Sequence, residues 1–228
     1  MTKRHAFFLV AVIGLGYSLR PQAQQGQHGQ APGGDLPHME HRFDNPEVSA
    51  KSFDDPARDV WQMPARVIAA LNLRSGQSVA DIGSGTGYFA IALAKGPTAP
   101  RVYAVDIEPA MVAYVRQRAE KEGLTNVFAV QGAGDRTNLP ESVDVVLIVD
   151  TYHHLPNRVA YFTALKQRLK PSGRLAIVDF RKGAPGGPPD EFRFTPEQIS
   201  GELARAGFTL QAQHDFLPRQ VFLVYQVK

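Results

Sequence analysis

The sequence predicts an α/β protein with a seven-stranded, mostly parallel sheet, helices on both faces of the sheet and a C-terminal antiparallel hairpin. Short apolar strands alternate with helices from about residue 53 onward, which is typical of a parallel sheet covered on both faces. The last two strands, "FTLQAQHDFL" and "QVFLVYQV", are separated only by "PRQ". A link this short makes a hairpin, because parallel neighbours need a long crossover.

The individual elements follow from apolar runs and from the residues that end them. The five strands expected to be parallel lie at 78–83, 101–107, 126–132, 144–150 and 173–180. The helices are expected at 56–72 with a kink at Pro64, and at 86–96, 108–123, 158–171 and 195–207. Thr195 is the expected N-cap of the last helix, with Pro196 at its first position.

The first 23 residues have the layout of a secretory signal peptide: a basic start, an apolar run of about twelve residues, then small and polar residues. That run is shorter than the roughly 20 residues that span a bilayer, although an uncleaved membrane anchor stays open. Residues 24–52 are rich in Gln, Gly and Pro and are expected to be a disordered linker. The folded domain is then 53–228. We expect it to be exported, periplasmic or anchored facing outward, and cytoplasmic if this signal does not work.

Charge gives little indication of a macromolecular partner. Three basic residues lie in the first 23, and without them the chain has 22 basic and 22 acidic side chains. We therefore expect no nucleic-acid binding by the folded part, and membrane contact only through the N-terminal segment. The sequence sets no oligomeric state.

The stretch "DIGSGTG" at 81–87 lets the backbone pass close to a ligand at the end of the first strand, where such sheets bind nucleotides. A phosphate-binding Walker loop is excluded, because no Gly-Lys-Ser/Thr follows. The dinucleotide pattern G-x-G-x-x-G needs a third glycine where Tyr88 stands. Asp106, at the end of the second strand, can accept hydrogen bonds from ribose hydroxyls. A nucleoside without a pyrophosphate is favoured.

Four segments, "VADIGSGTGYFAIALA", "VYAVDIEPAM", "VDVVLIVDTYHHLP" and "LKPSGRLAIVDF", occur in the order and spacing of a known family. The chain resembles the class I S-adenosylmethionine-dependent methyltransferases, in particular those acting on small molecules. The resemblance covers about residue 60 to the C-terminus, and it implies a Rossmann-like sheet with S-adenosyl-L-methionine as cofactor. The acceptor is expected to be a small molecule of unidentified kind.

The resemblance also implies which residues contact the cofactor. Asp81 lies near its ammonium group, the glycine loop lines its methionine and ribose, Asp106 holds the ribose hydroxyls, and Ile107 packs on the adenine. At the third strand the family often has Gly-Asp, whereas this chain has Gly132-Ala133, so Asp135 is the expected substitute. The full expected set is Asp81, Gly83, Ser84, Gly85, Gly87, Tyr88, Asp106, Ile107, Gly132, Asp135 and Asp150.

Methyl transfer from a sulfonium needs alignment first, and a base only if the nucleophile must lose a proton. His153 is the best candidate by its ordinary pKa, with Asp150, Tyr152 and Asp179 as alternatives. No metal site is expected, because Phe180-Arg181 follow where another oxygen ligand would be needed. The absence of cysteine excludes a thiol-dependent arsenite methyltransferase. An NAD-dependent oxidoreductase and a non-catalytic nucleoside-binding protein on the same fold remain alternatives.

Overall fold

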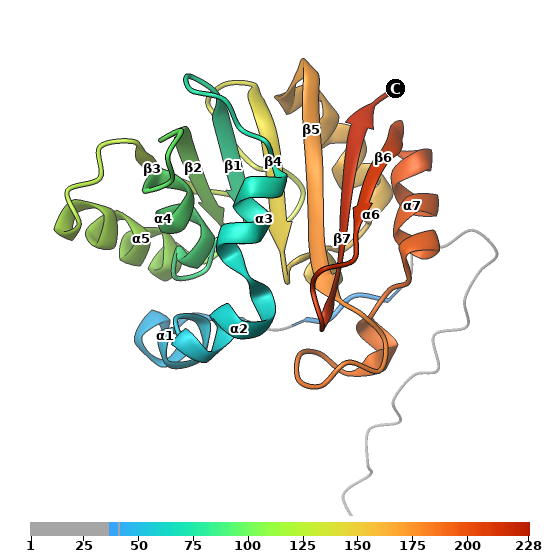
Figure 1. The fold of residues 1–228 in the computed structure, drawn as a ribbon, viewed down its shortest axis with the longest axis horizontal. Helices are drawn as coiled ribbons and strands as arrows, with labels where there is room; N and C mark the ends of the chain where they lie inside the picture. Colours follow the sequence, from blue (N-terminus) through green and yellow to red (C-terminus); the bar gives the residue numbers. More distant parts are fainter. Residues whose placement is uncertain (1–36, 41) are drawn as a thin grey trace, which may run out of the picture. The chain divides into compact units, whose positions relative to one another are not determined.

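The computed structural model describes residues 37–40 and 42–228. The expected signal peptide at 1–23 and the expected linker as far as residue 36 lie outside the described residues. Within the described part, seven strands form one sheet in the order β3-β2-β1-β4-β5-β7-β6 (Figure 1). Their bounds are β1 Ser78–Ile82, β2 Arg101–Asp106, β3 Val127–Gln131, β4 Val143–Val149, β5 Leu169–Phe180, β6 Phe208–His214 and β7 Gln220–Val227.

The strand directions confirm the predicted sheet. Strands β1 to β5 pair in parallel, and β7 pairs antiparallel with both β5 and β6. The C-terminal hairpin therefore folds back so that its second strand, β7, lies next to β5 and its first strand, β6, forms the edge. The strand order reverses between β1 and β4, and ligands of such sheets bind at that point, beyond the carboxyl ends of the strands.

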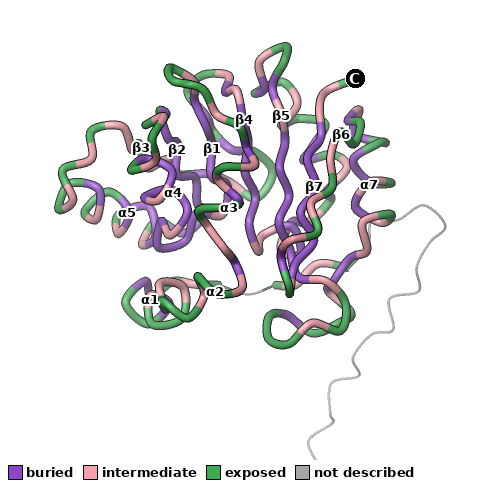
Figure 2. The backbone as a smooth tube through the Cα atoms, in the orientation of Figure 1, coloured by how far each residue is buried: buried purple, intermediate pink, exposed green. Residues whose placement is uncertain are grey.

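Side chains of the central strands alternate between two apolar cores, one on each face of the sheet. On one face, strand residues such as Ile82 and Ile148 pack with α6 (Arg158–Leu165) and α7 (Pro196–Arg205). On the other face, Val79 and Leu147 pack with α3 (Pro64–Ala70), α4 (Tyr88–Ala94) and α5 (Pro109–Lys121). Figure 2 shows the central strands as the most buried part of the chain. This is the two-sided burial that the continuous apolar strands predicted.

The end of the expected linker is helical, which corrects the sequence prediction for residues 46–52. Helix α1 runs Pro46–Phe53, with Asn45 as N-cap accepting a hydrogen bond from the backbone N of Val48 at 3.1 Å. Asn before Pro is a helix-start signal in the sequence, and the linker prediction, which relied on the low aliphatic content of the segment, did not use it. The folded domain thus begins before residue 53.

One further boundary differs from the sequence prediction, and the predicted kink at Pro64 is confirmed. Helix α6 ends at Leu165 rather than at Pro171, and a single turn of 3-10 helix at Lys166–Arg168 leads directly into β5, which begins at Leu169. The expected helix before β1 is divided into the 3-10 turn Pro56–Arg58, helix α2 (Asp59–Gln62) and α3, with Met63 in a left-handed conformation before Pro64. Thr195 caps α7 through a capping box, as expected.

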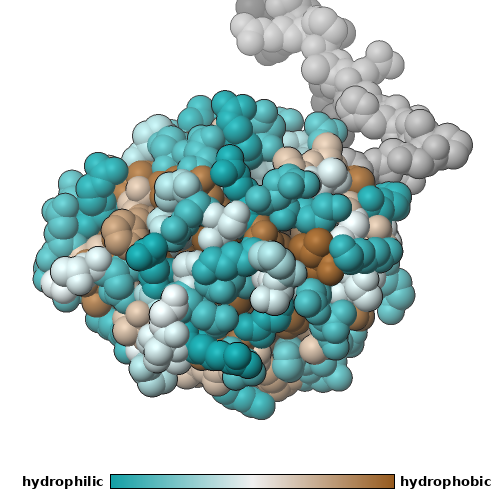
Figure 3. Space-filling model, turned by 90° about the horizontal axis from the view of Figure 1, so that it is seen from above, coloured by the Kyte–Doolittle hydropathy of each residue, from teal (hydrophilic) through white to brown (hydrophobic). Residues whose placement is uncertain are grey.

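The carboxyl ends of the parallel strands point to the lower edge in Figure 1, where α1 and α2 lie. The opposite edge, seen from above in Figure 3, is largely hydrophilic with scattered apolar residues. Within residues 37–40 and 42–228, no helix is both long and apolar enough to cross a membrane.

Candidate active site

A cavity of about 590 Å³ lies at the carboxyl ends of the strands. Its walls come from the loop after β1, from the ends of β2 and β4, from the segment before α2 and from residues 187–189. Most of the expected site residues line it. They are Asp81, Gly83, Ser84, Gly85, Tyr88, Asp106, Ile107, Gly132, Asp150 and His153.

The glycine loop is shaped by close approach of other chain segments. Gly83 has a φ of 73°, and a Cβ added there would lie 2.2 Å from Oγ1 of Thr151. At Gly85, an added Cβ would lie 3.2 Å from the ring of Phe53 on α1. Gly87 is outside the cavity lining. It is the N-cap of α4, and a Cβ added there would lie 3.2 Å from the side chain of Val115. The structure therefore shows a packing role for Gly87 at the start of α4, and its role as a cofactor contact stays a prediction.

Asp81 carries an unsatisfied acceptor toward this cavity. Its Oδ2 is buried and has no hydrogen-bond partner among the described residues. Burial, and then the negative charge of Asp106, raises the pKa of Asp81 to about 7. A buried carboxylate oxygen without a donor is costly, so this position suits a ligand that supplies a positive charge and N–H groups.

Asp106 is held by the two loops that it joins. Its Oδ2 accepts a hydrogen bond from Gly85 N at 2.8 Å, and its Oδ1 accepts one from Glu108 N at 2.9 Å. Burial raises the pKa of Asp106 above its ordinary value, and these backbone donors offset part of the shift. Beside it, the Ile107 side chain is 57% exposed and lines the cavity, as an apolar platform for a flat ring would.

Asp135 does not replace the missing family aspartate. Its side chain is 74% exposed and pairs with the guanidinium of Arg136 at 3.1 Å. Gly132, Ala133 and Gly134 line the cavity, whereas Asp135 does not. The prediction of Asp135 as a cofactor contact is wrong, because the turn after β3 presents backbone rather than this carboxylate to the ligand.

Asp150 is a fixed part of the wall. The backbone of Asp150 is left-handed, with a φ of 51°. Its carboxylate accepts hydrogen bonds from the side-chain amides of Gln62 at 2.8 Å and Gln220 at 2.5 Å. Nη2 of Arg58 lies 3.5 Å from Oδ2 of Asp150. Burial, and then the charge of Asp179, raises the pKa of Asp150 to about 6. Both oxygens of Asp150 are thus engaged, and the residue lines the cavity, so its roles as a cofactor contact and as an alternative base stay predictions.

Tyr152 is not in the cavity, and its assignment as a catalytic residue is wrong. It is fully buried, stacks on Phe162, and donates its hydroxyl hydrogen bond to Glu202 of α7. The 3-10 turn Tyr152–His154 directs neighbouring side chains in different directions, so Tyr152 points into the core while His153 lines the cavity. Residue order alone does not distinguish these two side-chain directions.

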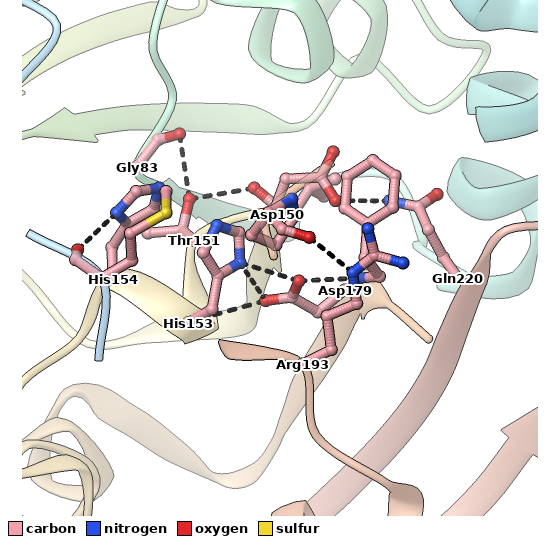
Figure 4. Close-up of polar contacts among 12 residues, drawn as sticks. Gly83, Asp150, Thr151, His153, His154, Asp179, Arg193 and Gln220 are labelled. Atoms are coloured by element: carbon pink, nitrogen blue, oxygen red, sulfur yellow. Dashed lines mark hydrogen bonds and ion pairs between the residues drawn. The ribbon is translucent and has the colours of Figure 1, made fainter. Parts of the chain in front are cut away.

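His153 forms a pair with Asp179 (Figure 4). Its Nδ1 lies 2.8 Å and 3.0 Å from the two carboxylate oxygens. Burial alone would lower the pKa of His153, but the charge of Asp179 and this hydrogen bond outweigh it, so the pKa is raised. The sequence had Asp179 only as an alternative base, whereas the structure makes it the partner that orients the base.

His154 faces the segment before α1. Its Nδ1 lies 2.9 Å from the carbonyl oxygen of Met39, and the N–H of Met39 donates to the carbonyl of His153 at 2.8 Å. Arg42, further along the same segment, forms a bidentate pair with Glu108 at 2.9 Å and 2.8 Å. Met39 and Phe43 thereby become part of the cavity wall, which sequence reasoning missed by treating the segment as a linker.

The cavity lies at the switch point of a Rossmann-like sheet, between the glycine loop after β1 and the aspartate at the end of β2. This arrangement is typical of the class I S-adenosylmethionine-dependent methyltransferases. A family model described as a methyltransferase domain matches residues 73–212, which is more than half of the chain. The chain belongs to this methyltransferase-domain family.

Curated relatives are similar over the core of the domain. An arsenite methyltransferase of Halobacterium salinarum is 33% identical over 134 residues, covering 58% of this chain and 34% of that protein. The ubiquinone/menaquinone biosynthesis C-methyltransferase UbiE of Cupriavidus metallidurans is 32% identical over 118 residues, covering 50% of this chain and 48% of that protein. The chain thus spans less than half the length of these two relatives.

Solved structures of methyltransferases have a similar fold. The crystal structure of an S-adenosylmethionine-dependent methyltransferase from Aquifex aeolicus has a TM-score of 0.75 and 28% identity, and it covers 82% of this chain and 100% of that one. The glycopeptide N-methyltransferase MtfA, solved with S-adenosylmethionine, has a TM-score of 0.61 at 16% identity over 72% of this chain and 87% of that one, a likeness of fold. The cofactor of this chain is S-adenosylmethionine.

The residues present fit that cofactor. The unpaired Oδ2 of Asp81 matches its ammonium group, the carboxylate of Asp106 lies at the end of β2 where the ribose is expected, and Ile107 offers a surface for the adenine. When bound, the cofactor supplies a methyl group on a positively charged sulfur. The protein's residues bind it, exclude water and align an acceptor.

Proposed function

We propose that this chain transfers the methyl group of S-adenosylmethionine to a small-molecule acceptor. The observation that carries the proposal is that one cavity is lined both by Asp81 and Asp106, which are expected to bind the cofactor, and by His153, whose Nδ1 is paired with Asp179. Met39 and Phe43 form part of the wall of this cavity, which favours a compact acceptor. Substrates of the curated relatives are not carried over, and an arsenite acceptor is disfavoured because these 228 residues contain no cysteine.

The test is a calorimetric titration of the full chain with S-adenosylmethionine and, separately, with NADH. We expect S-adenosylmethionine to bind and NADH not to bind, because Tyr88 lines the cavity where a dinucleotide loop would have glycine. Asp81→Asn should weaken binding of S-adenosylmethionine roughly 10- to 100-fold, since a charge-assisted hydrogen bond contributes about 1.5–3 kcal/mol. Asp135→Asn is the matched control, and its affinity should equal that of the wild type.

Binding alone does not separate an enzyme from a non-catalytic nucleoside-binding protein on the same fold. Incubation with methyl-labelled cofactor and small-metabolite or cell-envelope fractions makes that distinction. Label in a small product supports the enzyme, whereas tight cofactor binding with no label in any fraction supports the non-catalytic alternative. Binding of NADH in preference to S-adenosylmethionine would reject the proposal.

We also propose that residues 1–23 direct export, so that the domain acts in the periplasm or from an outward-facing membrane anchor. The basic start and the short apolar run of this segment support the proposal. A fusion of residues 1–52 to a reporter enzyme that is active only outside the cytoplasm tests it. We expect the reporter to be active with the native segment and inactive when Leu9 and Val10 are changed to Asp. Reporter activity confined to the cytoplasm would contradict export.

A further inference from the structure

The His153–Asp179 pair is built to hold an imidazole in one orientation. Asp179, near the end of β5, contacts Nδ1 of His153 and also accepts hydrogen bonds from the backbone N of His153 at 3.2 Å and of Phe180 at 2.7 Å. Both residues are buried, with His153 only 3% exposed. These hydrogen bonds fix the orientation of the Asp179 carboxylate and, through it, the position of the His153 ring.

This contact assigns the proton of the neutral imidazole. A carboxylate accepts hydrogen bonds, so Nδ1 must carry the N–H and Nε2 is left with a lone pair. No hydrogen bond of Nε2 to another described residue is present, and the ring lines the cavity. In Figure 4 the second ring nitrogen points away from Asp179, toward the side where Thr151 and Gly83 lie. A lone pair directed into a ligand cavity is the geometry of a general base.

The walls next to this base are flat and apolar. Phe180, the neighbour of Asp179, lies 5.5 Å from the Trp61 ring between centroids, and Phe43 packs edge-on to His154 at 5.8 Å. Gly187 lies so close to the ring of Phe180 that an added Cβ would be 2.6 Å from it. Trp61, Phe180 and Phe43 all line the cavity, so its wall offers aromatic faces and edges on which an aromatic acceptor can pack.

When His153 is neutral, as a base must be, the same walls offer no free cationic side chain to an anionic acceptor. Two arginines line the described part of the cavity, and both guanidinium groups are engaged: Arg58 with Asp150, the carbonyl of Phe53 and Gln62, and Arg136 with Asp135. An acceptor with a carboxylate or phosphate would therefore be desolvated here without a cationic partner, which is unfavourable.

Resting on the proposed methyl transfer, we infer that the acceptor is an uncharged aromatic hydroxyl compound, with Nε2 of His153 as the base that takes the hydroxyl proton and Asp179 as the residue that positions it. The acceptor oxygen bonds to the methyl carbon as its proton passes to Nε2, and the electron pair of the broken carbon–sulfur bond stays on sulfur. The imidazolium formed is stabilised by the carboxylate of Asp179. A neutral hydroxyl group is a weak nucleophile, so a hydroxyl acceptor is the kind that gains from this base.

The test uses 4-nitrophenol as the probe, because its neutral and phenolate forms absorb at different wavelengths. The full chain is saturated with S-adenosylhomocysteine, and the probe is added at a pH below its own pKa. Trp61 is the only tryptophan of the chain and lines the cavity, so quenching of its fluorescence reports binding of the probe. We expect bound probe to show the phenolate spectrum in the wild type.

Three variants identify the base. His153→Gln should still quench Trp61 but lose the phenolate spectrum, and it should lower kcat for a phenolic acceptor by about 10²- to 10⁴-fold. Asp179→Asn should shift the pH at which bound phenolate appears, an effect that a merely structural role would not produce. His214→Gln is the control, since His214 lies on β6 against Phe222 and outside the cavity.

The outcomes separate the two proposals. Failure of S-adenosylhomocysteine and S-adenosylmethionine to bind overturns the proposed function itself. If both bind but 4-nitrophenol does not quench Trp61, the aromatic acceptor class is wrong. If the probe binds as neutral phenol, or if His153→Gln keeps the phenolate spectrum, His153 is not the base. Should His153→Gln fail to fold, the wild-type spectrum and the pH shift in Asp179→Asn still decide the matter.

Discussion

At the scale of single residues, His153 shows how one neighbour sets the chemistry of a side chain. Two carboxylates, Asp179 and Asp150, and one guanidinium, Arg193, act on its charge, and the tilted ring of His154 lies 4.2 Å from it between centroids. Burial favours the neutral form, yet Asp179 outweighs it and raises the pKa of His153 above the ordinary 6.5. A histidine with a raised pKa in the folded protein stabilises it when protonated.

That stabilisation has a definite pH dependence. It is fully present below the unfolded pKa of about 6.5 and is lost as the pH rises through the higher folded value. Asp179→Asn removes the charge that favours imidazolium, so the folded pKa of His153 should fall and the melting temperature should drop most below pH 6. Proton NMR of the imidazole and thermal melts from pH 5 to 9 measure both effects. An unchanged His153 titration in Asp179→Asn would contradict the pairing.

Two glycines with the same backbone conformation offer a second test. Gly83 and Gly76 have φ values of 73° and 80°, but a Cβ at Gly83 would lie 2.2 Å from Thr151, whereas nothing lies within 4 Å of one at Gly76. Both Gly→Ala variants carry the cost of a left-handed alanine, about 1–2 kcal/mol. Gly83→Ala should cost roughly 1–3 kcal/mol more in urea unfolding and should weaken cofactor binding. Equal losses for the two variants would rule out the close contact.

At the scale of elements, the loop between β5 and α7 is more ordered than its Gly/Pro-rich sequence indicates. The buried guanidinium of Arg193 donates to the carbonyl oxygens of Pro188, Ala184, Gly186 and Arg181 at 2.7, 2.6, 2.5 and 3.2 Å. One side chain thus satisfies four backbone acceptors and holds residues 187–189 against the cavity. No periodicity in the sequence could have assigned this role to Arg193.

Removing that guanidinium should release the loop. Arg193→Met leaves buried carbonyls without donors, at a cost of about 1–3 kcal/mol each for those that water cannot reach. We expect a lower melting temperature and faster cleavage within residues 182–190 by a protease of broad specificity. Lys182→Met is the matched control, since its exposed ammonium makes one long contact of 3.4 Å. Cleavage rates that match between the two variants would show that Arg193 does not hold the loop.

At the scale of the whole molecule, the apolar pattern of the sequence was sufficient for the sheet and its two cores. Alternating burial of residues such as Val79 and Ile82 is a local property of strands, and it is readable from sequence. The direction of a side chain in a single turn is not, which is why Tyr152 was placed in the site. Contacts between residues distant in sequence, such as Gln220 with Asp150, could not be predicted from the sequence either.

The correction of Tyr152 can be tested across the whole fold, because its hydroxyl belongs to a buried ionic network that joins α6 to α7. Arg158 is fully buried and binds Glu202 through Nε at 2.6 Å and Nη2 at 3.1 Å, and Tyr152 donates to the same carboxylate. Arg158→Met or Glu202→Met alone strands a buried charge and should cost about 3–5 kcal/mol in urea unfolding.

The double variant Arg158→Met/Glu202→Met removes both charges, so its loss should be well below the sum of the two single losses. Tyr152→Phe should lower the free energy of unfolding by only about 1 kcal/mol, because it removes one hydrogen bond and the Glu202 carboxylate keeps its contacts with Arg158. All four proteins should bind S-adenosylmethionine with wild-type affinity at a temperature where they are folded, because the network lies outside the cavity lining. Additive losses would mean that the pair is not coupled. A Tyr152→Phe variant that is stable but has lost methyl transfer would restore the catalytic role that the structure denies it.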